Sequence, residues 1–378
     1  MFPVERNSIV MIRVAHIVGS MSPSGIGNFL MNVYRNIDRE QIQFDFIVHE
    51  HRAVSFDDEI IQLGGRLHYV TLKSESVWKN FNEIRKIVKR EKYDMVFRHA
   101  DNSIVSLDLL ACKLGGAKWR IPHSHSTSTG NIKLHKLLRP FLNLLSTHRF
   151  ACSTEAGKWL YGKKKYHVVM NGIDIPTFAF SNENRKLIRK QMEWEDKFVI
   201  GHVGNFLKVK NHTFMLSLLA ELKKCIPNVK LVFIGGGDLY NNIVQDIEDK
   251  HLGEYVDLPG VRNDTAAILS AMDLFMFPSL YEGMPIALVE AQTAGLSCVV
   301  SDVITDDVIF SESVHKLPLA DMKQWIKTIT SIYENVSSDN REMKKDIVAN
   351  ATKEKGFCVK ALGKYYDTFI LRELENRQ

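Results

Sequence analysis

The feature that most constrains the fold is a regular alternation of short apolar runs with longer amphipathic stretches. The first two runs, Ile12–Val18 and Ile42–Val48, are rich in β-branched residues and enclose a stretch of helical periodicity at 26–37. Strands that alternate with helices in this order form parallel sheets covered by helices. The alternation predicts further strands at 94–97, 119–123, 198–203, 230–234 and 273–277, and helices at 77–92, 103–114, 212–225 and 239–251.

The alternation is interrupted at 168–178, where Asn171-Gly172 and Pro176 indicate a turn-rich linker. We therefore expect two doubly wound α/β domains, at 1–175 and 176–378. The stretch from residue 321 onward has helical periodicity and no strand pattern, so it is expected as a helical tail of the second domain. Ligands of doubly wound sheets bind at the carboxyl ends of the strands, so the domains are expected to face a central cleft.

Charge and composition exclude several classes of protein. Residues 1–175 carry 25 Lys and Arg against 16 Asp and Glu, whereas the remainder carries 24 against 28, so the first half suits an anionic partner. Charged residues interrupt every early apolar run, and the N-terminus lacks the pattern of a secretory leader. The five cysteines are scattered singly. We expect a cytoplasmic protein with reduced thiols and no membrane-spanning helix.

Two glycine-rich segments, GSMSPSGIG at 19–27 and IGGGD at 234–238, each follow an expected strand and precede an expected helix. Backbone amides at such a turn suit a phosphate group, but glycines there also serve tight packing, so both interpretations stay open. The chain contains no Walker A pattern, which disfavours a P-loop NTPase.

The strongest chemical signal is the segment PSLYEGMPIALVEA at 278–291, which follows an expected strand. A helix that begins near Pro285 directs its unpaired amides toward the preceding loop, where they favour phosphate. Glu282 lies in that loop and Glu290 lies inside the helix, and carboxylates accept hydrogen bonds from the vicinal hydroxyls of a sugar or a ribose. Taken alone, Glu282 is better explained as a charge at the helix N-terminus and Glu290 as a solvated helix position, but the whole segment favours a ligand.

Glu282 and Glu290 form an E-x7-E motif, and EGMPIALVEA with the following Ala294-Gly295 closely resembles the donor-site signature of family 4 glycosyltransferases. Further segments resemble that family in the same order, namely VVMNGID at 168–174, HVGNFLKVKNH at 202–212, LVFIGGGDL and VDLPGVRND. The resemblance implies the GT-B fold, in which two Rossmann-like domains face a central cleft. It is strongest to bacterial capsular and exopolysaccharide glycosyltransferases.

The resemblance also implies roles for individual residues. Glu290 would bind the ribose and Glu282 the hydroxyls of the donor sugar, while Lys210 would neutralise the diphosphate as charge develops on the leaving group. With His125, discussed below, Glu282 and Lys210 form the expected catalytic set. The other expected donor-binding positions are Gly25 in the first domain, Val261 and Arg262 beside the base, Gly283, Met284, Pro285, Ile286 and Ala287 around the diphosphate, and Asn205.

Asn205 departs from the family pattern, because the family usually has an arginine there that contacts the diphosphate. Lys208 is a candidate to replace that arginine, and weaker donor binding is the alternative. The chain contains no Asp-x-Asp triplet of the kind that holds a metal ion, which agrees with metal independence. We expect no cofactor besides the nucleotide-sugar substrate.

His123 and His125 lie where the expected strand at 119–123 ends in a polar loop. In the family, a histidine followed by serine or threonine contacts the donor sugar, and His125-Ser126 fits this pattern better than His123. The His-x-His spacing also suits a metal ion, but no third ligand with convincing spacing follows, so we expect no metal. Burial in the core is the ordinary alternative for either histidine.

The stretch 132–149 is basic and amphipathic, with Lys133, Lys136 and Arg139 beside a leucine-rich face. Most such helices cover a sheet, but the family makes peripheral contact with an anionic inner membrane surface a second interpretation. The basic residues are not interleaved with aromatic ones, so nucleic acid is not an expected partner.

The sequence therefore predicts a glycosyltransferase that moves a sugar from a nucleotide sugar, expected to be a UDP-sugar, to a hydroxyl of a glycan or lipid-linked saccharide in polysaccharide biosynthesis. Because family members retain the anomeric configuration, a retaining, metal-independent reaction is expected. The expected location is the cytoplasm, with peripheral contact at the inner membrane face. The alternatives are a nucleotide-sugar epimerase of the same fold and a catalytically weak partner subunit of another transferase, for which Asn205 is the only support.

Overall fold

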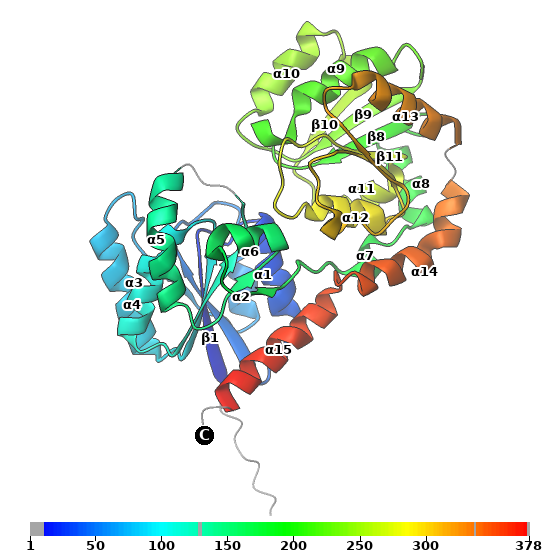
Figure 1. Cartoon of the computed structure of the whole chain (residues 1–378). Coiled ribbons are helices and arrows are strands. Elements are labelled where there is room, and N and C mark those ends of the chain that lie inside the picture. The colour runs from blue at the N-terminus through cyan, green and yellow to red at the C-terminus, as the bar shows by residue number, and fades with distance from the viewer. Residues whose placement is uncertain (1–10, 128–130, 336–337, 376–378) are drawn as a thin grey trace, which may run out of the picture. The chain divides into compact units, whose positions relative to one another are not determined.

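The computed structural model describes residues 11–127, 131–335 and 338–375, and the chain divides into two compact units (Figure 1). Unit 1 comprises Met1–Gly172 and Val359–Gln378, and unit 2 comprises Ile173–Cys358. The first boundary lies inside the expected linker and close to the expected division after residue 175. The second boundary was not expected, because the sequence analysis assigned the whole tail to the second domain.

Unit 1 contains a seven-stranded parallel sheet with the order β3-β2-β1-β4-β5-β6-β7. Its strands are β1 (Ile12–Val18), β2 (Ile42–Val48), β3 (Leu67–Tyr69), β4 (Met95–Ala100), β5 (Trp119–Ser124), β6 (Phe150–Ala151) and β7 (His167–Val168). Its helices are α1 (Gly25–Asn36), α2 (Asp57–Gln62), α3 (Val77–Glu91), α4 (Ser106–Gly115), α5 (Ile132–Leu145), α6 (Thr154–Tyr161) and α15 (Val359–Glu375). The strand order reverses between β1 and β4, so the loops that follow these strands meet there.

Helices cover both faces of this sheet (Figure 1). On one face, Phe29 of α1 and Phe369 of α15 belong to the same apolar cluster as β-strand residues such as Phe97. On the other face, Ile84 of α3 and Ala111 of α4 form a second cluster. Strands covered on both faces are apolar along their whole length, which explains why the sequence shows continuous runs instead of alternation.

The last helix, α15, differs from the sequence expectation because it completes the core of unit 1. Tyr366, Phe369 and Ile370 are buried in that core. Gly363 allows the close approach to α1, since a Cβ atom there would lie 2.2 Å from the carbonyl oxygen of Asn36. Helical periodicity identifies the apolar face of a helix but not the sheet that receives it. The tail is helical as expected, and its last helix belongs to the first unit.

Unit 2 contains a six-stranded parallel sheet with the order β10-β9-β8-β11-β12-β13, which repeats the order of the first six strands of unit 1. Its strands are β8 (Phe198–Val203), β9 (Val229–Ile234), β10 (Val256–Gly260), β11 (Leu274–Phe277), β12 (Ser297–Ser301) and β13 (Val314–Leu317). Its helices are α7 (Ile175–Phe178), α8 (Asn182–Gln191), α9 (His212–Leu222), α10 (Tyr240–Asp249), α11 (Thr265–Ala271), α12 (Ile286–Thr293), α13 (Met322–Asn335) and α14 (Ser338–Glu354). The order reverses between β8 and β11.

Serine side chains explain where several helices begin. Ser24, Ser76 and Ser153 are the N-caps of α1, α3 and α6, and each accepts a hydrogen bond from the backbone amide three residues later. By contrast, α12 begins after Pro285 without a side-chain cap. None of the described helices has both the length and the apolar composition needed to cross a membrane.

Candidate active site

Glycines hold the loops after β8 and β9 of unit 2 in direct contact. Gly235 has a φ of 144°, and a Cβ atom there would lie 2.1 Å from the carbonyl oxygen of Gly204. The amide of Phe206 donates to the carbonyl oxygen of Gly236 over 2.9 Å. The IGGGD segment therefore serves the close packing that was one of its two interpretations.

The two expected catalytic residues of unit 2 form an ion pair. Nζ of Lys210 lies 2.6 Å from Oε1 of Glu282, and the side chains are only 17% and 13% exposed. The ammonium group also lies 4.7 Å from the centre of the Phe277 ring. The amide of Leu280 donates to the carbonyl oxygen of Val209 over 2.8 Å, which joins the loops that carry the pair. The fold thus brings together two charges that are 72 residues apart in sequence.

The helix α12 begins where the sequence predicted, directly after Pro285. Because Pro285 provides no side-chain cap, the amides of Ile286 and Ala287 have no hydrogen-bond partner among the described residues. Unpaired amides at a helix N-terminus attract an anion. Gly283 and Met284 lead into this turn from Glu282.

Glu290 lies in the second turn of α12 with its side chain partly exposed. Its carboxylate has no hydrogen-bond or ionic partner within the described part of the chain. Burial without such a partner raises the pKa of Glu290 to about 8. A ligand that donates hydrogen bonds to this carboxylate would remove that penalty, and ribose hydroxyls are donors of this kind.

The remaining expected positions of unit 2 lie in the loops after β8 and β10. Asn205 and Lys208 are both exposed. Arg262 forms a two-point ion pair with Asp264, at 2.8 and 2.6 Å, so its charge is already compensated. Val261 is 72% exposed and is available to a ligand surface.

In unit 1, Gly25 is the first residue of α1, and a Cβ atom there would meet nothing within 4 Å. The closely packed glycine of this turn is Gly27, whose Cβ atom would lie 2.0 Å from the carbonyl oxygen of Ser22. A cavity of about 250 Å³ lies at the reversal point of the sheet and is lined by Ser24, His99 and neighbouring residues from β1 and β4. Gly25 therefore leaves open space beside this cavity.

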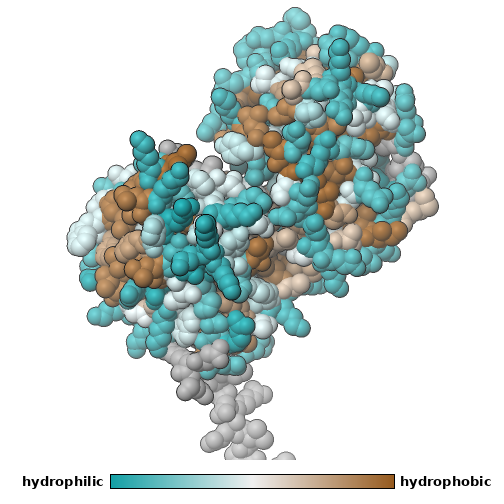
Figure 2. Space-filling view, viewed as in Figure 1, coloured by the Kyte–Doolittle hydropathy of each residue, from teal (hydrophilic) through white to brown (hydrophobic). Residues whose placement is uncertain are grey.

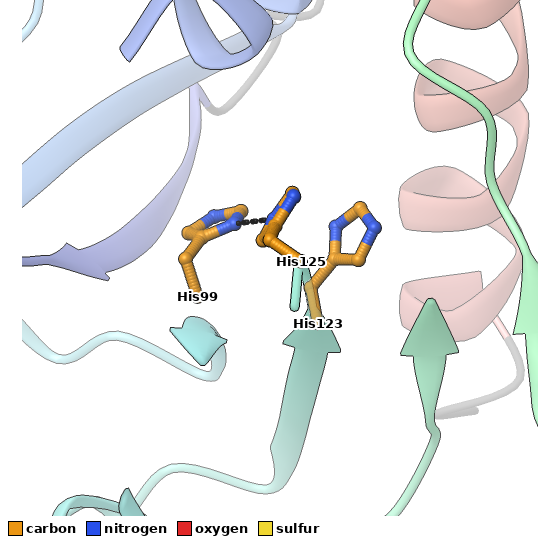
Figure 3. Close-up of side chains that lie close together, drawn as sticks. All are labelled: His99, His123 and His125. Atoms are coloured by element: carbon orange, nitrogen blue, oxygen red, sulfur yellow. Dashed lines mark hydrogen bonds between the residues drawn. The ribbon is translucent and has the colours of Figure 1, made fainter. Parts of the chain in front are cut away.

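His125 belongs to a row of histidines that sequence reasoning did not find, and Figure 3 shows its bond to His99, with His123 beside it. Nε2 of His125 lies 2.9 Å from Nδ1 of His99, and Nε2 of His99 lies 3.1 Å from Nδ1 of His16. His123 lies beside the row and contacts the hydroxyl of Tyr366 at 3.4 Å. These residues come from β1, β4 and the end of β5, so the only available signal was one histidine in each of three neighbouring strands.

The structure corrects one reason for excluding a metal ion. The sequence offered no third ligand near His123 and His125, but His99 lies on the neighbouring strand, and nitrogens of all three lie within 4.8 Å of one another. Burial lowers the pKa of His125 to about 3 and that of His99 and His123 well below the usual range. The three rings are therefore neutral at pH 7 and act as hydrogen-bonding groups.

The basic helix α5 presents apolar side chains on its surface. Ile132, Leu137 and Leu144 are 51%, 73% and 79% exposed, and Lys133 and Lys136 are exposed beside them. Apolar side chains gather on the part of unit 1 that carries α5 (Figure 2). The opposite side of the helix buries residues such as Leu142, and α5 packs beside α4 and α6.

Comparisons with known proteins identify the family. The family described as "Glycosyl transferases group 1" matches residues 184–354. The putative glycosyltransferase EpsF of Bacillus subtilis is 36% identical over 312 residues, which cover 78% of this chain and 80% of EpsF. The chain belongs to the group 1 glycosyltransferases.

Two further comparisons fit this membership. An Escherichia coli relative, named UDP-Gal:α-D-GlcNAc-diphosphoundecaprenol α-1,3-galactosyltransferase, is 28% identical over 315 residues, covering 77% of this chain and 80% of that protein. The crystal structure of Anabaena HepE in complex with UDP matches 96% of this chain and all of that one, with a TM-score of 0.76 and 17% identity. Together with the two Rossmann-like sheets, this confirms the GT-B fold expected from the sequence.

Proposed function

We propose that this chain is a retaining, metal-independent glycosyltransferase that moves a sugar from a UDP-sugar to a hydroxyl of a glycan or lipid-linked saccharide. The observation that carries the proposal lies in unit 2, where the Lys210–Glu282 pair, the unpaired amides of Ile286 and Ala287 and the unpartnered carboxylate of Glu290 occur on one strand–loop–helix segment and its neighbour. Cation, amides and carboxylates are the groups that a nucleoside diphosphate sugar requires.

Each group has a task in the proposed reaction. The carboxylate of Glu290 accepts hydrogen bonds from the ribose, and the amides of Ile286 and Ala287 with Lys210 hold the diphosphate. The bond from the anomeric carbon to the phosphate oxygen breaks as the acceptor oxygen bonds to that carbon on the same face. The acceptor proton passes to the leaving phosphate. Lys210 and the helix amides stabilise the developing charge, which is the task that a metal ion performs elsewhere.

The choice of substrates is supported by the comparisons. The Escherichia coli relative is named for a UDP-galactose donor and a diphosphoundecaprenol-linked acceptor, and the HepE structure contains UDP. We infer a UDP-sugar donor, a glycan or lipid-linked acceptor, and a place in polysaccharide biosynthesis. A cytoplasmic enzyme with a lipid-linked acceptor would work at the inner membrane face, and the exposed leucines and lysines of α5 suit an anionic surface.

Nucleotide binding tests the donor site directly. We would measure the melting temperature with excess UDP, GDP or ADP in EDTA, for the wild-type protein and for Glu290→Ala. The matched control is Glu221→Ala, since the Glu221 side chain is 46% exposed at the C-terminal end of α9. A ligand at a hundred times its Kd adds about 2.7 kcal/mol of stability. We expect a UDP shift in the wild type and the control that Glu290→Ala abolishes.

The reaction is tested with a UDP-sugar and a lipid-linked saccharide acceptor. NMR of the product should show the anomeric configuration of the donor, and an inverted product would overturn the retaining course. Conversion of the UDP-sugar without any acceptor would favour the epimerase alternative instead. Absence of a shift with all three nucleotides would favour the partner-subunit alternative.

A further inference from the structure

In the row His16, His99 and His125, the environment of the buried His16 decides which ring donates in each hydrogen bond. The ring of His16 is fully buried and stacks on Phe97, with centres 5.0 Å apart and planes 5° apart. Burial lowers the pKa of His16 to about 3, so this ring is neutral like the other two. A neutral imidazole has one N–H donor and one lone pair. His99 therefore donates through one nitrogen and accepts through the other.

Two arrangements satisfy both hydrogen bonds, and they differ at the far nitrogen of His16. Nε2 of His16 is buried without a partner among the described residues. If His99 donated toward His16, that nitrogen would carry an unpaired N–H group. If His16 donates toward His99, the nitrogen keeps only a lone pair. Buried N–H groups without a partner are rarer than unpaired acceptors.

The aromatic rings around His16 offer no alternative acceptor. An N–H group lies in the plane of its imidazole ring and needs an aromatic face turned toward that edge. The rings of Phe44, Phe46 and Phe97 make angles of 43°, 31° and 5° with the His16 ring, so none stands perpendicular to it. The donor direction therefore runs from His16 to His99 to His125.

We propose that His16 and His99 are positioning residues that fix His125 in the tautomer with its proton on Nδ1, so that His125 presents an N–H donor to a sugar oxygen. Nε2 of His125 is occupied as the acceptor from His99. Nδ1 of His125 has no partner within the described residues, and the side chain is partly exposed. This inference rests on the proposed transfer reaction, in which His125 contacts the sugar.

A metal ion on His99, His123 and His125 is the competing explanation of the cluster. It would have to separate the nitrogens of His99 and His125, which already lie at hydrogen-bond distance. Nε2 of His99 would then face Nδ1 of His16 at 3.1 Å, in place of the carboxylate, backbone carbonyl or water that usually orients a metal-bound histidine. The hydrogen-bonded row keeps these nitrogens at their observed distance and with their observed partners, so we favour it.

Nitrogen-15 NMR of histidine-labelled protein tests the tautomers without reference to activity. We expect the Nδ1–H form for His16, His99 and His125, with resonances assigned by single substitutions. The change His123→Phe should leave these tautomers unchanged, because His123 is outside the row. The Nε2–H form at His125 would overturn the proposal, as would displacement of these resonances by stoichiometric Zn²⁺ that persists after dialysis.

Activity then tests the positioning role. The change His99→Gln keeps a donor toward His125 and an acceptor toward His16, whereas His99→Leu keeps neither. We expect His99→Leu to lower kcat about tenfold with the UDP-induced melting shift unchanged, and His99→Gln to restore most of kcat. Equal losses in both variants would overturn the proposal. Wild-type protein without UDP binding or transfer would instead refute the proposed function and leave the tautomers as a separate result.

Discussion

Unit 1 and unit 2 have sheets of the same strand order, and in each one chemically active side chains gather where that order reverses. At the β1–β4 reversal of unit 1, these side chains are neutral histidines that bond to one another. At the β8–β11 reversal of unit 2, they are the charged pair Lys210–Glu282 and, farther along, the carboxyl group of Glu290, whose pKa is raised to about 8. The fold determines where a site lies, and the residues on it decide whether it offers directional hydrogen bonds or charge.

The largest expected difference between the two units is their loss of stability at acidic pH. Burial lowers the pKa of His16, His99, His123 and His125, so between about pH 3 and 6.5 the folded unit 1 binds fewer protons than the unfolded chain. Its stability must therefore fall as the pH falls below 6.5, by up to about 1.4 kcal/mol per pH unit for each histidine.

Hydrogen exchange of backbone amides measures this effect for each sheet separately. From pH 7 to pH 5, the opening free energy of β1 and β4 should fall by more than that of β8 and β11, where His202 is the buried histidine of the sheet. A control with the exposed His51→Gln should behave as the wild type. Equal losses of opening free energy in the two sheets would contradict the expected difference between unit 1 and unit 2.

Among the substitutions, removal of the Lys210 cation should have the largest effect on catalysis. The change Lys210→Ala leaves the leaving group without its charged partner, so turnover should fall by roughly 10²–10³-fold. The control is Lys224→Ala, which removes an exposed cation paired with Glu221. Steady-state rates of sugar transfer measure both variants, and a loss below tenfold would remove Lys210 from the proposed mechanism.

Glu290 should give unit 2 a pH dependence of the opposite sign. Its pKa is raised to about 8 in the folded protein, so between about pH 4.5 and 8 the folded state binds more protons than the unfolded chain. This contribution to stability is complete below the unfolded pKa and is lost as the pH rises through 8. Urea unfolding at pH 6.5 and 8.5 should show a larger loss for the wild type than for Glu290→Gln. Parallel losses would show that Glu290 ionises normally.

The smallest effect is expected at Asn205. The change Asn205→Arg adds a cation to an exposed loop beside the donor site, so UDP should bind about fivefold more tightly, as an exposed charge pair contributes up to about 1 kcal/mol. Titration calorimetry with UDP measures the affinity of Asn205→Arg and, in parallel, that of Lys208→Ala. If only Lys208→Ala changes the affinity, Lys208 already performs the role of the missing arginine.

The sequence predicted what depends on local order and missed what depends on neighbouring strands. The strands β1, β2, β8 and β9 were predicted from continuous apolar runs, and the start of α12 from Pro285. The partners of His125 were missed because His99 and His16 are 26 and 109 residues away in the chain and meet it only through sheet order. The roles of the donor-site residues remain predictions.

Two other features could not be read from the sequence for physical reasons. The short strands β6 and β7 have two residues each, too few for a pattern to be recognised. The ion pair between Lys210 and Glu282 depends on how the loops after β8 and β11 approach each other, where the amide of Leu280 donates to the carbonyl oxygen of Val209. The spacing of residues in the sequence reveals neither the two-residue strands nor the approach of the two loops.

The return of α15 to unit 1 has a consequence for synthesis of the protein. All of unit 2, Ile173–Cys358, is synthesised before Val359–Glu375. Until then, the apolar surface that will receive Tyr366 and Phe369 stays uncovered, and Phe29 lacks its contact with Tyr366. The unit that is begun first is therefore completed last, so early termination near residue 358 should leave unit 2 complete and unit 1 exposed to aggregation and degradation.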